Sequence, residues 1–285
     1  MTQLILGTAQ LGSAYGITNA RGRLADDEVR SVLELARASG IVTFDTAADY
    51  GDSQRRLGMF APPGGRYVTK FSLPPTAVPD ADSLYGRSMA DLHVSGLAGL
   101  MFHKMKDLDD PRAGRTIELM KEARHQGAVE RIGVSIYDDT DLAKALQTFP
   151  GLTLMPFPGN ILDGHLLDSP VMEELHASGV ELHVRSAFLQ GILLADPTAL
   201  SPFFAPLAPA LVHLATVASQ NGTTVLGLAL RYLRDHPLVD GVVVGATTTA
   251  ELEAILAEWR LTESGIVSTD LRVPRSLLDP RLWPR

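Results

Sequence analysis

Cysteine is absent from this sequence of 285 residues. Its absence excludes disulfide bonds, thiolate metal sites and cysteine nucleophiles, although it leaves the cellular compartment open. Lysine and arginine form no basic run, and the formal net charge is -8, which argues against a nucleic-acid-binding surface. We therefore expect no nucleic-acid partner, and chemistry that relies on other side chains.

Long hydrophobic runs are also missing. No stretch reaches the roughly 18 consecutive apolar residues that a membrane span needs. The first residues, 1–7 (MTQLILG), have no basic region and an apolar run of only three residues, so they do not resemble a signal peptide. The sequence predicts a cytoplasmic protein with no membrane partner.

Short apolar runs alternate with helical patterns along the whole chain. The strand-like runs cover residues 4–7, 42–45, 67–70, 99–103, 132–135, 152–155, 181–186 and 241–245. Helical spacing of apolar residues is found at 26–39, 116–126, 140–148, 170–178, 207–221, 224–235 and 249–259. This alternation predicts a parallel sheet of the α/β class, and eight repeats favour a closed (β/α)8 TIM barrel. An open, doubly wound sheet is the alternative, but no G-x-G-x-x-G loop follows any strand.

One domain, residues 1–285, accounts for the pattern, because no linker or low-complexity segment interrupts it. Two segments have no regular pattern: the proline-rich residues 187–206 and the C-terminal tail, 261–285. In a barrel both can reach the rim that carries the site. Tyr15, Asn19, the loop 104–115 and Trp283 are candidates for the substrate pocket.

Polar residues end three consecutive strand-like runs. Asp45, Lys70 and His103 close the second, third and fourth runs, and Tyr50 follows Asp45 by five positions. Barrel enzymes carry their catalytic groups at this end of the strands. A phenol has an ordinary pKa of about 10 and donates its proton poorly at neutral pH without help. We expect Lys70 to lower the pKa of Tyr50, Asp45 to hold the lysine charged, and His103 to orient a carbonyl oxygen.

Each of these four residues also has a structural interpretation. Asp45 can form a turn or cap a helix, Tyr50 can be a packed aromatic ring, Lys70 a solvated charge and His103 a buried, hydrogen-bonded histidine. Their joint placement at one end of neighbouring strands favours the catalytic interpretation. The set suits protonation of a carbonyl oxygen as hydride arrives, or the reverse reaction.

Several segments resemble the aldo-keto reductase family: residues 6–12 (LGTAQLG), 44–47 (FDTA), 50–51 (YG), 53–58 (SQRRLG), 68–70 (VTK), 102–103 (FH) and 132–135 (IGVS). The resemblance implies a (β/α)8 barrel that moves hydride between a nicotinamide and a carbonyl or alcohol, without a metal. It implies that Tyr50 is the general acid/base, that Asp45 and Lys70 tune it, and that His103 orients the substrate. The usual N-terminal β-hairpin of the family is expected to be absent. Residues 183–191 (HVRSAFLQG) resemble a bacterial branch linked to sugar and polysaccharide metabolism.

For the cofactor, the resemblance implies NADP(H), with NAD(H) possible. The candidate cofactor-binding residues are Ser135, Asn160, Arg185, Ser186, Phe188, Gly191, Gly245, Ala246, Thr247 and Glu251. Three positions depart from the family pattern: Ile136 and Pro156 stand where amides hold the nicotinamide, and Arg185 stands where a tyrosine stacks on it. Arg185 is expected to contact pyrophosphate or an anionic substrate, or to lie buried in an ion pair.

The segment after the last strand, 245–252, has no basic residue to bind an adenosine 2′-phosphate. Glu251 stands near the position where an arginine often reads that phosphate, and a carboxylate there would repel it. Alternatively, Thr248 and Glu251 form a capping box at the helix start. The preference between NADP and NAD therefore stays open.

The sequence thus predicts an NAD(P)-dependent oxidoreductase that acts on a sugar-like or small carbonyl substrate. Two alternatives stay open on the same scaffold: a redox-neutral enzyme, such as an epimerase or dehydratase, and a non-catalytic cofactor-sensing protein. The oligomeric state is not predicted.

Overall fold

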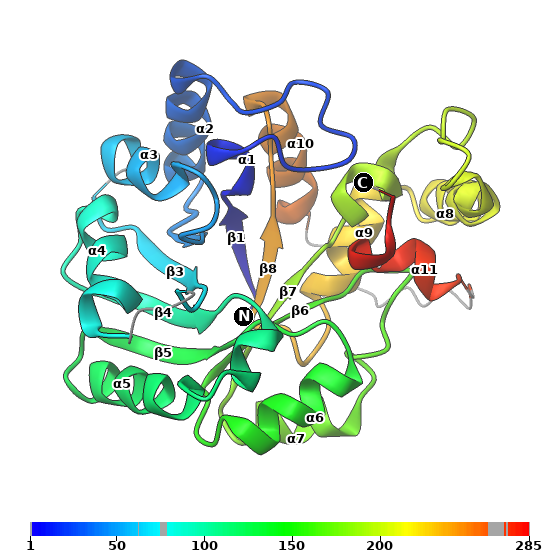
Figure 1. Ribbon diagram of the computed structural model, residues 1–285. Coiled ribbons are helices and arrows are strands. Elements are labelled where there is room, and N and C mark those ends of the chain that lie inside the picture. Colours follow the sequence, from blue (N-terminus) through cyan, green and yellow to red (C-terminus); the bar gives the residue numbers. More distant parts are fainter. Residues whose placement is uncertain (1, 62, 75–78, 262–270, 272, 285) are drawn as a thin grey trace.

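A closed barrel of eight parallel strands forms the centre of the molecule (Figure 1). The computed structural model describes residues 2–61, 63–74, 79–261, 271 and 273–284. Strands pair in sequence order, and β1 pairs with β8 in the register Leu4↔Val242, which closes the barrel. The predicted TIM barrel is confirmed, and the open sheet is excluded by this closing pair. The strands are β1 (Gln3–Gly7), β2 (Thr43–Asp45), β3 (Arg66–Phe71), β4 (Leu97–Phe102), β5 (Val129–Val134), β6 (Leu154–Pro158), β7 (Glu181–Arg185) and β8 (Gly241–Val244).

The barrel strands are apolar because parallel strands in this fold are covered on both faces. Every residue of β4 is buried, and Phe44 of β2 and Phe157 of β6 are fully buried. Small residues allow close strand approach where the barrel needs it. A Cβ at Gly133 would overlap the backbone oxygen of Leu154, its partner in the β5–β6 register. Glycine at this position is therefore required by the strand pairing.

Helices surround the barrel, and each predicted helical segment forms a helix. The helices are α1 (Ala9–Gly12), α2 (Asp26–Ala38), α3 (Ser53–Phe60), α4 (Arg87–Leu92), α5 (Ala113–His125), α6 (Asp139–Thr148), α7 (Pro170–Ala177), α8 (Ala208–Gln220), α9 (Val225–Arg234), α10 (Thr249–Arg260) and α11 (Arg275–Leu278). Shorter or irregular helical segments are η1 (Asp82–Gly86), η2 (Met105–Asp109), η3 (Leu189–Leu194), η4 (Ala205–Leu207) and η5 (Pro280–Leu282). The prediction omitted α1, α3, α4 and α11, which have between four and eight residues each.

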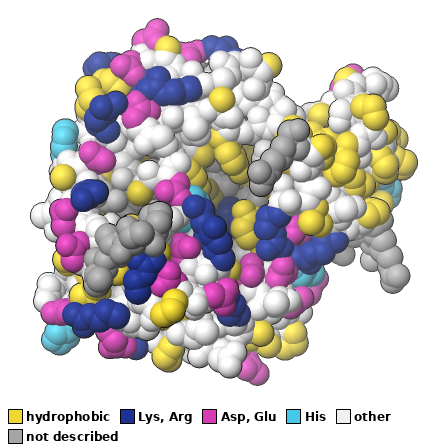
Figure 2. Space-filling model, in the orientation of Figure 1, with side chains coloured by type: hydrophobic (Ala, Val, Ile, Leu, Met, Phe, Trp, Pro, Cys, Tyr) yellow, Lys and Arg dark blue, Asp and Glu magenta, His cyan; other side chains and the backbone are white. Residues whose placement is uncertain are grey.

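A second hydrophobic core lies beside the barrel, where α8 stands apart from the strands (Figure 1). Hydrophobic side chains also gather on the surface over α8 (Figure 2). Trp283, expected in the substrate pocket, is instead buried in this second core, with its ring edge-on to Phe204 at 4.9 Å between centroids. The tail is therefore less irregular than predicted, because α11 and η5 pack it against α8 and α9. Residues 262–270, 272 and 285 of the tail lie outside the described residues. Within the described residues, no helix is both long and apolar enough to span a membrane.

Candidate active site

The ends of β2 and β3 hold a buried ion pair. The Nζ of Lys70 donates to Oδ1 of Asp45 at 2.6 Å and to the backbone oxygen of Thr46 at 3.0 Å. Lys70 is 2% exposed and Asp45 6%. The same ammonium lies 5.4 Å from the centroid of the Tyr50 ring. The structure therefore brings together the Asp45, Lys70 and Tyr50 of the sequence prediction.

Two glycines fix the backbone that carries Tyr50. A Cβ at Gly12, the last residue of α1, would overlap the backbone oxygen of Tyr50. Gly51 has a φ of 58°, and a Cβ there would overlap the backbone oxygen of Gly12. Nearby, Ser53 Oγ donates to the backbone oxygen of Thr8 at 2.9 Å. The position of the phenol therefore depends on a backbone contact that only glycine permits.

The protonation of Tyr50 differs from the sequence expectation. Burial raises the pKa of the Tyr50 phenol above its ordinary value, and the carboxylate of Asp45 raises it further. We expected Lys70 to lower this pKa, but burial and the Asp45 carboxylate, which pairs with Lys70 at 2.6 Å, have the larger effect. Tyr50 is consequently a protonated phenol throughout the neutral pH range.

His103 stands beside Tyr50 as a neutral imidazole. Its ring is edge-on to that of Tyr50, at 5.5 Å between centroids and 83° between planes. Burial and the positive charge of Lys70 lower the pKa of His103 below its ordinary value. The Nδ1 of His103 lies 3.3 Å from Oδ2 of Asp49. Because an ionised carboxylate can only accept, Nδ1 carries the ring proton in this contact, and Nε2 is an acceptor.

Asp49 is a polar neighbour that the sequence prediction missed. It accepts from Ser72 Oγ at 2.6 Å and from Lys104 Nζ at 3.1 Å. Burial acts to raise the pKa of Asp49, but these hydrogen bonds outweigh it and lower the pKa. The position of Asp49 between Asp45 and Tyr50 could have identified it as a site residue from the sequence. Asp49 therefore fixes the orientation of the His103 ring.

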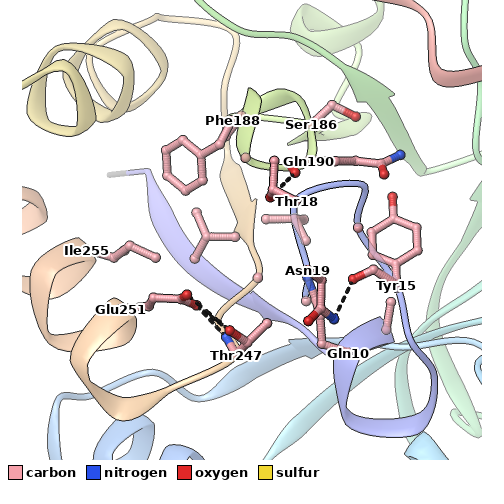
Figure 3. Close-up of a pocket in the computed structure, with 18 of the residues that line it drawn as sticks. Gln10, Tyr15, Thr18, Asn19, Ser186, Phe188, Gln190, Thr247, Glu251 and Ile255 are labelled. Atoms are coloured by element: carbon pink, nitrogen blue, oxygen red, sulfur yellow. Dashed lines mark hydrogen bonds between the residues drawn. The ribbon is translucent and has the colours of Figure 1, made fainter. Parts of the chain in front are cut away.

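A cavity of about 520 Å³ opens from Asp45 and Tyr50 toward the start of α10. Tyr15 and Tyr50 both line this cavity. Glu251 and Ile255 lie on the opposite side (Figure 3). Tyr15 and Asn19 line the cavity as predicted, whereas no residue of the loop 104–115 does among those described. The cavity thus connects the Tyr50 phenol with the start of α10.

Two loops meet over the cavity. Thr18 Oγ1 donates to the backbone oxygen of Gln190 at 2.7 Å (Figure 3). The Ile17 N–H donates to Oε1 of Gln190 at 3.0 Å. Gly191, with a φ of 95°, leaves no room for a Cβ beside Thr18. The loop after β1 and the proline-rich segment 187–206 therefore form one wall, which confirms that this segment reaches the rim.

Seven of the predicted cofactor residues line this cavity: Arg185, Ser186, Phe188, Gly191, Gly245, Thr247 and Glu251. Three do not: Ala246, Ser135 and Asn160. Ser135 Oγ accepts from Arg185 at 3.3 Å, while the Asn160 amide accepts from the Leu162 N–H at 2.9 Å and donates to the Ser186 backbone oxygen at 3.4 Å. The side chains of Ser135 and Asn160 are thus engaged within the protein.

Gln10 is a cavity residue that the sequence prediction did not single out. A Cβ at Gly245 would overlap its side-chain amide, so the glycine at the end of β8 makes room for Gln10. Its position in the segment 6–12, which carries the family resemblance, could have identified Gln10 from the sequence.

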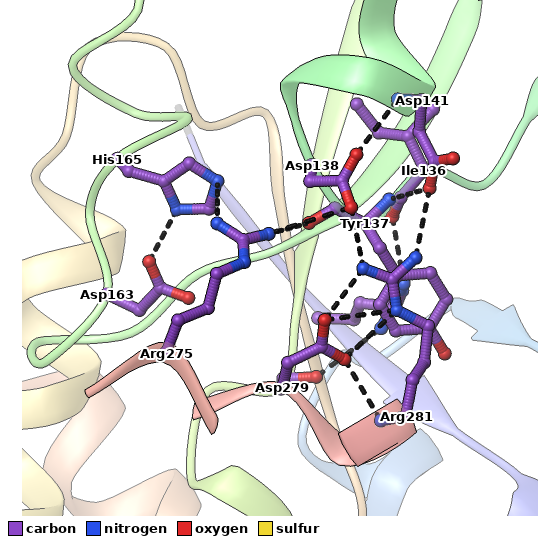
Figure 4. A network of polar contacts seen from close by, with 11 residues as sticks. Ile136, Tyr137, Asp138, Asp141, Asp163, His165, Arg275, Asp279 and Arg281 are labelled. Atoms are coloured by element: carbon purple, nitrogen blue, oxygen red, sulfur yellow. Dashed lines mark hydrogen bonds and ion pairs between the residues drawn. The ribbon is translucent and has the colours of Figure 1, made fainter. Parts of the chain in front are cut away.

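Arg185 lies across the end of β5 and forms no ion pair with the described residues. Its Nη2 donates to the backbone oxygen of Ile136 at 2.9 Å, and its guanidinium stacks 3.9 Å from the centroid of the Tyr137 ring. Arg281 contacts the same ring at 4.3 Å and pairs with Asp138 and Asp279 (Figure 4). The tail thereby reaches the rim at Tyr137, as predicted.

The Glu251 side chain is held at the start of α10 by Thr247, which follows β8. Its carboxylate accepts from the backbone N–H of Thr247 at 2.6 Å and from Thr247 Oγ1 at 2.9 Å (Figure 3). Thr248 Oγ1 accepts from the Glu251 N–H at 3.1 Å, so the predicted cap forms, although the return bond goes to Thr247. The carboxylate remains on the cavity wall.

Tyr50, Lys70 and Asp45 thus lie together at one end of the strands of a closed (β/α)8 barrel. The model of the Aldo/keto reductase family matches residues 85–269, and the chain belongs to this family. It is 28% identical over 205 residues to the aldo-keto reductase str7 of Strobilurus tenacellus, a match that covers 66% of this chain and 57% of that protein. The matched part is thus less than two thirds of that relative.

Solved structures share the fold. A glycerol dehydrogenase from Gluconobacter oxydans superposes with a TM-score of 0.69 at 17% identity, covering 92% of this chain and 87% of its own. An aldo-keto reductase from Bacillus halodurans, in its holo form, gives a TM-score of 0.68 at 17% identity and covers 94% of each chain. At these identities the likeness establishes the architecture, and the site has to be argued from this chain's own residues.

Proposed function

We propose that this enzyme reduces a carbonyl to an alcohol, or catalyses the reverse, with NAD(P)(H) and a sugar-like or small carbonyl substrate. The observation that carries the proposal is the buried Asp45–Lys70 pair beneath the Tyr50 phenol, at one end of the cavity. A charged pair this deeply buried is costly to maintain, and its place beside a pocket phenol supports a role in proton transfer.

In the reduction direction Tyr50 donates its proton to the substrate oxygen. The phenol is fully protonated because its pKa is raised, while the developing alkoxide is the stronger base. Lys70 lies close enough to stabilise the phenolate that forms, and Asp45 keeps the lysine charged and in place. A bound nicotinamide would supply the hydride. In the oxidation direction the Nε2 of His103 can accept a hydrogen bond from the substrate hydroxyl.

The described residues fit a dinucleotide better at its phosphate end than at its nicotinamide end. The backbone N–H groups of Thr249 and Ala250 have no acceptor among the described residues, and a helix start of this kind suits a phosphate. Arg21, which pairs with Glu28, also lines the cavity. At the other end Ile136 and Pro156 cannot replace the family's amides, so Arg185 and Ser186 are the polar groups available there.

Glu251 supports NAD(H) rather than the expected NADP(H). A carboxylate on the cavity wall beside the α10 start repels an adenosine 2′-phosphate and can accept a hydrogen bond from a free 2′-hydroxyl. The three hydrogen bonds to Thr247 hold this carboxylate in place. The proposed carrier is therefore a nicotinamide dinucleotide with preference for the form without the 2′-phosphate.

A redox-neutral reaction is the second candidate, because Ser135 and Asn160 are engaged within the protein rather than at the cavity. A fluorescence titration with NADH and NADPH tests the main proposal. We expect quenching at micromolar NADH and weaker binding of NADPH, followed by loss of nicotinamide absorbance when an aldehyde is added. Failure of both dinucleotides to bind would contradict the proposal. Product formation without net change in absorbance would favour the redox-neutral alternative.

A further inference from the structure

Arg185 and Glu251 line the cavity without an ion-pair partner among the described residues, and of these two Arg185 is the one near Tyr50. Lys70 pairs with Asp45, and Arg21 pairs with Glu28. Arg185 lines the same cavity but forms no ion pair with any carboxylate among the described residues. The catalytic end of the cavity therefore carries an excess positive charge from Arg185.

The contacts of Arg185 leave donors unused. A guanidinium has five N–H groups. Its three hydrogen bonds go to neutral acceptors: Ser135 Oγ at 3.3 Å, Ser186 Oγ at 3.5 Å and the Ile136 backbone oxygen at 2.9 Å. Two N–H groups thus remain without a protein acceptor among the described residues. The stack on Tyr137 at 3.9 Å fixes the plane of the guanidinium, so these donors are held in a constant direction.

The position of Arg185 favours the substrate over the dinucleotide phosphates. Its charge acts on Tyr50, since it opposes the effect of burial on the pKa of that phenol. The reacting carbon must lie next to Tyr50, whereas the pyrophosphate of an extended dinucleotide lies several bonds away, toward Thr247 and α10. A partly buried guanidinium is suited to a carboxylate or phosphate, because charge-assisted and bidentate hydrogen bonds replace its lost hydration.

We propose that Arg185 binds an anionic group, a carboxylate or a phosphate, on the carbonyl or alcohol substrate. The inference rests on the proposed function and narrows its substrate class to anionic carbonyl compounds or alcohols. The net charge of -8 gives anions no long-range attraction, so the selectivity arises locally at this guanidinium. Arg185 is then a specificity residue at the same end of the cavity as the proton donor.

Two matched aldehydes test this assignment with NADH as cofactor: 4-carboxybenzaldehyde and its neutral methyl ester. We expect the acid to have the higher kcat/KM, and Arg185→Gln to lower its kcat/KM by about tenfold to hundredfold, the scale of a hydrogen bond between charged groups. The ester should change less than about threefold. Arg185→Lys should restore part of the loss for the acid only, because it keeps the charge without the planar fork.

Equal losses for both aldehydes, together with weaker NADH binding, would overturn the proposal and assign Arg185 to the dinucleotide. Equal kcat/KM for acid and ester in the wild type would also overturn it. Calorimetry with benzoate and benzamide separates this inference from the proposed function, because it requires no turnover. Benzoate should bind more tightly than benzamide, and Arg185→Gln should remove the difference. Arg281→Gln is the control. Arg281 contacts Tyr137 but does not line the cavity, so this variant should keep the difference in affinity between benzoate and benzamide.

Discussion

The two ends of the cavity carry opposite charges, and different structural elements hold them: strand ends at one end and a helix start at the other. At the Tyr50 end, Lys70 and Asp45 form a buried pair fixed by strand ends, and Arg185 adds a positive charge. At the α10 end, the Glu251 carboxylate is held by hydrogen bonds within one helix start. The buried end tolerates little change without loss of folding, whereas the helix start can be altered at small cost. We propose that the first end sets the reaction type and the second the dinucleotide preference.

The largest expected effect comes from breaking the buried pair. Lys70→Met leaves Asp45 buried without its cation, and we expect it to lower the free energy of unfolding by about 3–5 kcal/mol, as for other broken buried pairs. Lys104→Met is the matched control, because Lys104 pairs with the half-exposed Asp49 and should change stability by less than about 1 kcal/mol. Urea unfolding measures both. Similar values for the two variants would show that the Lys70 pair does not stabilise the fold.

A smaller effect is expected where the Tyr50 backbone meets α1. Gly12→Ala puts a Cβ into the backbone oxygen of Tyr50, so we expect a loss of about 1–3 kcal/mol, as for other overpacked sites, with reduced turnover. Gly114→Ala, at a helical position with open space around it, should be neutral or should stabilise by up to about 1 kcal/mol. Thermal unfolding and aldehyde reduction distinguish the two variants. Full activity in Gly12→Ala would refute the role of this contact in placing the phenol.

The smallest effect is expected at the α10 end. Glu251→Gln keeps one acceptor oxygen for Thr247 but removes the negative charge, so NADPH should bind about threefold to tenfold more tightly, the scale of an electrostatic contact near a surface. NADH affinity should change less than about threefold. Fluorescence titration of each variant gives both dissociation constants. Parallel changes for NADH and NADPH would mean that Glu251 does not face the 2′ position.

The barrel and the catalytic set were predictable because both depend on apolar runs that end in polar residues. Asp45, Lys70 and His103 follow from strand ends, since the carboxyl ends of parallel strands meet at one rim. Side-chain direction is not encoded in this pattern. Asn160 was expected at the cofactor but turns to Leu162 and Ser186, and Trp283 was expected in the pocket but lies in the second core.

Electrostatic balance was the other unpredictable quantity. The sequence predicted the pairing of Asp45 with Lys70 but not the depth of burial, so the expected fall in the Tyr50 pKa is replaced by a rise. Likewise, Asp49 contacts His103 through a geometry that only the folded loop defines. Burial and pair distances, both three-dimensional properties, decide these cases.

Turnover and NADH affinity of the Tyr50→Phe variant test the central claim most directly. The account predicts that loss of the phenol proton lowers kcat for aldehyde reduction by about 10²–10⁴-fold, the usual contribution of a general acid. The dissociation constant of NADH should stay within about twofold of the wild type, because the α10 end of the cavity is unchanged. Unchanged kcat in Tyr50→Phe would contradict the account, since the proton would then come from another group.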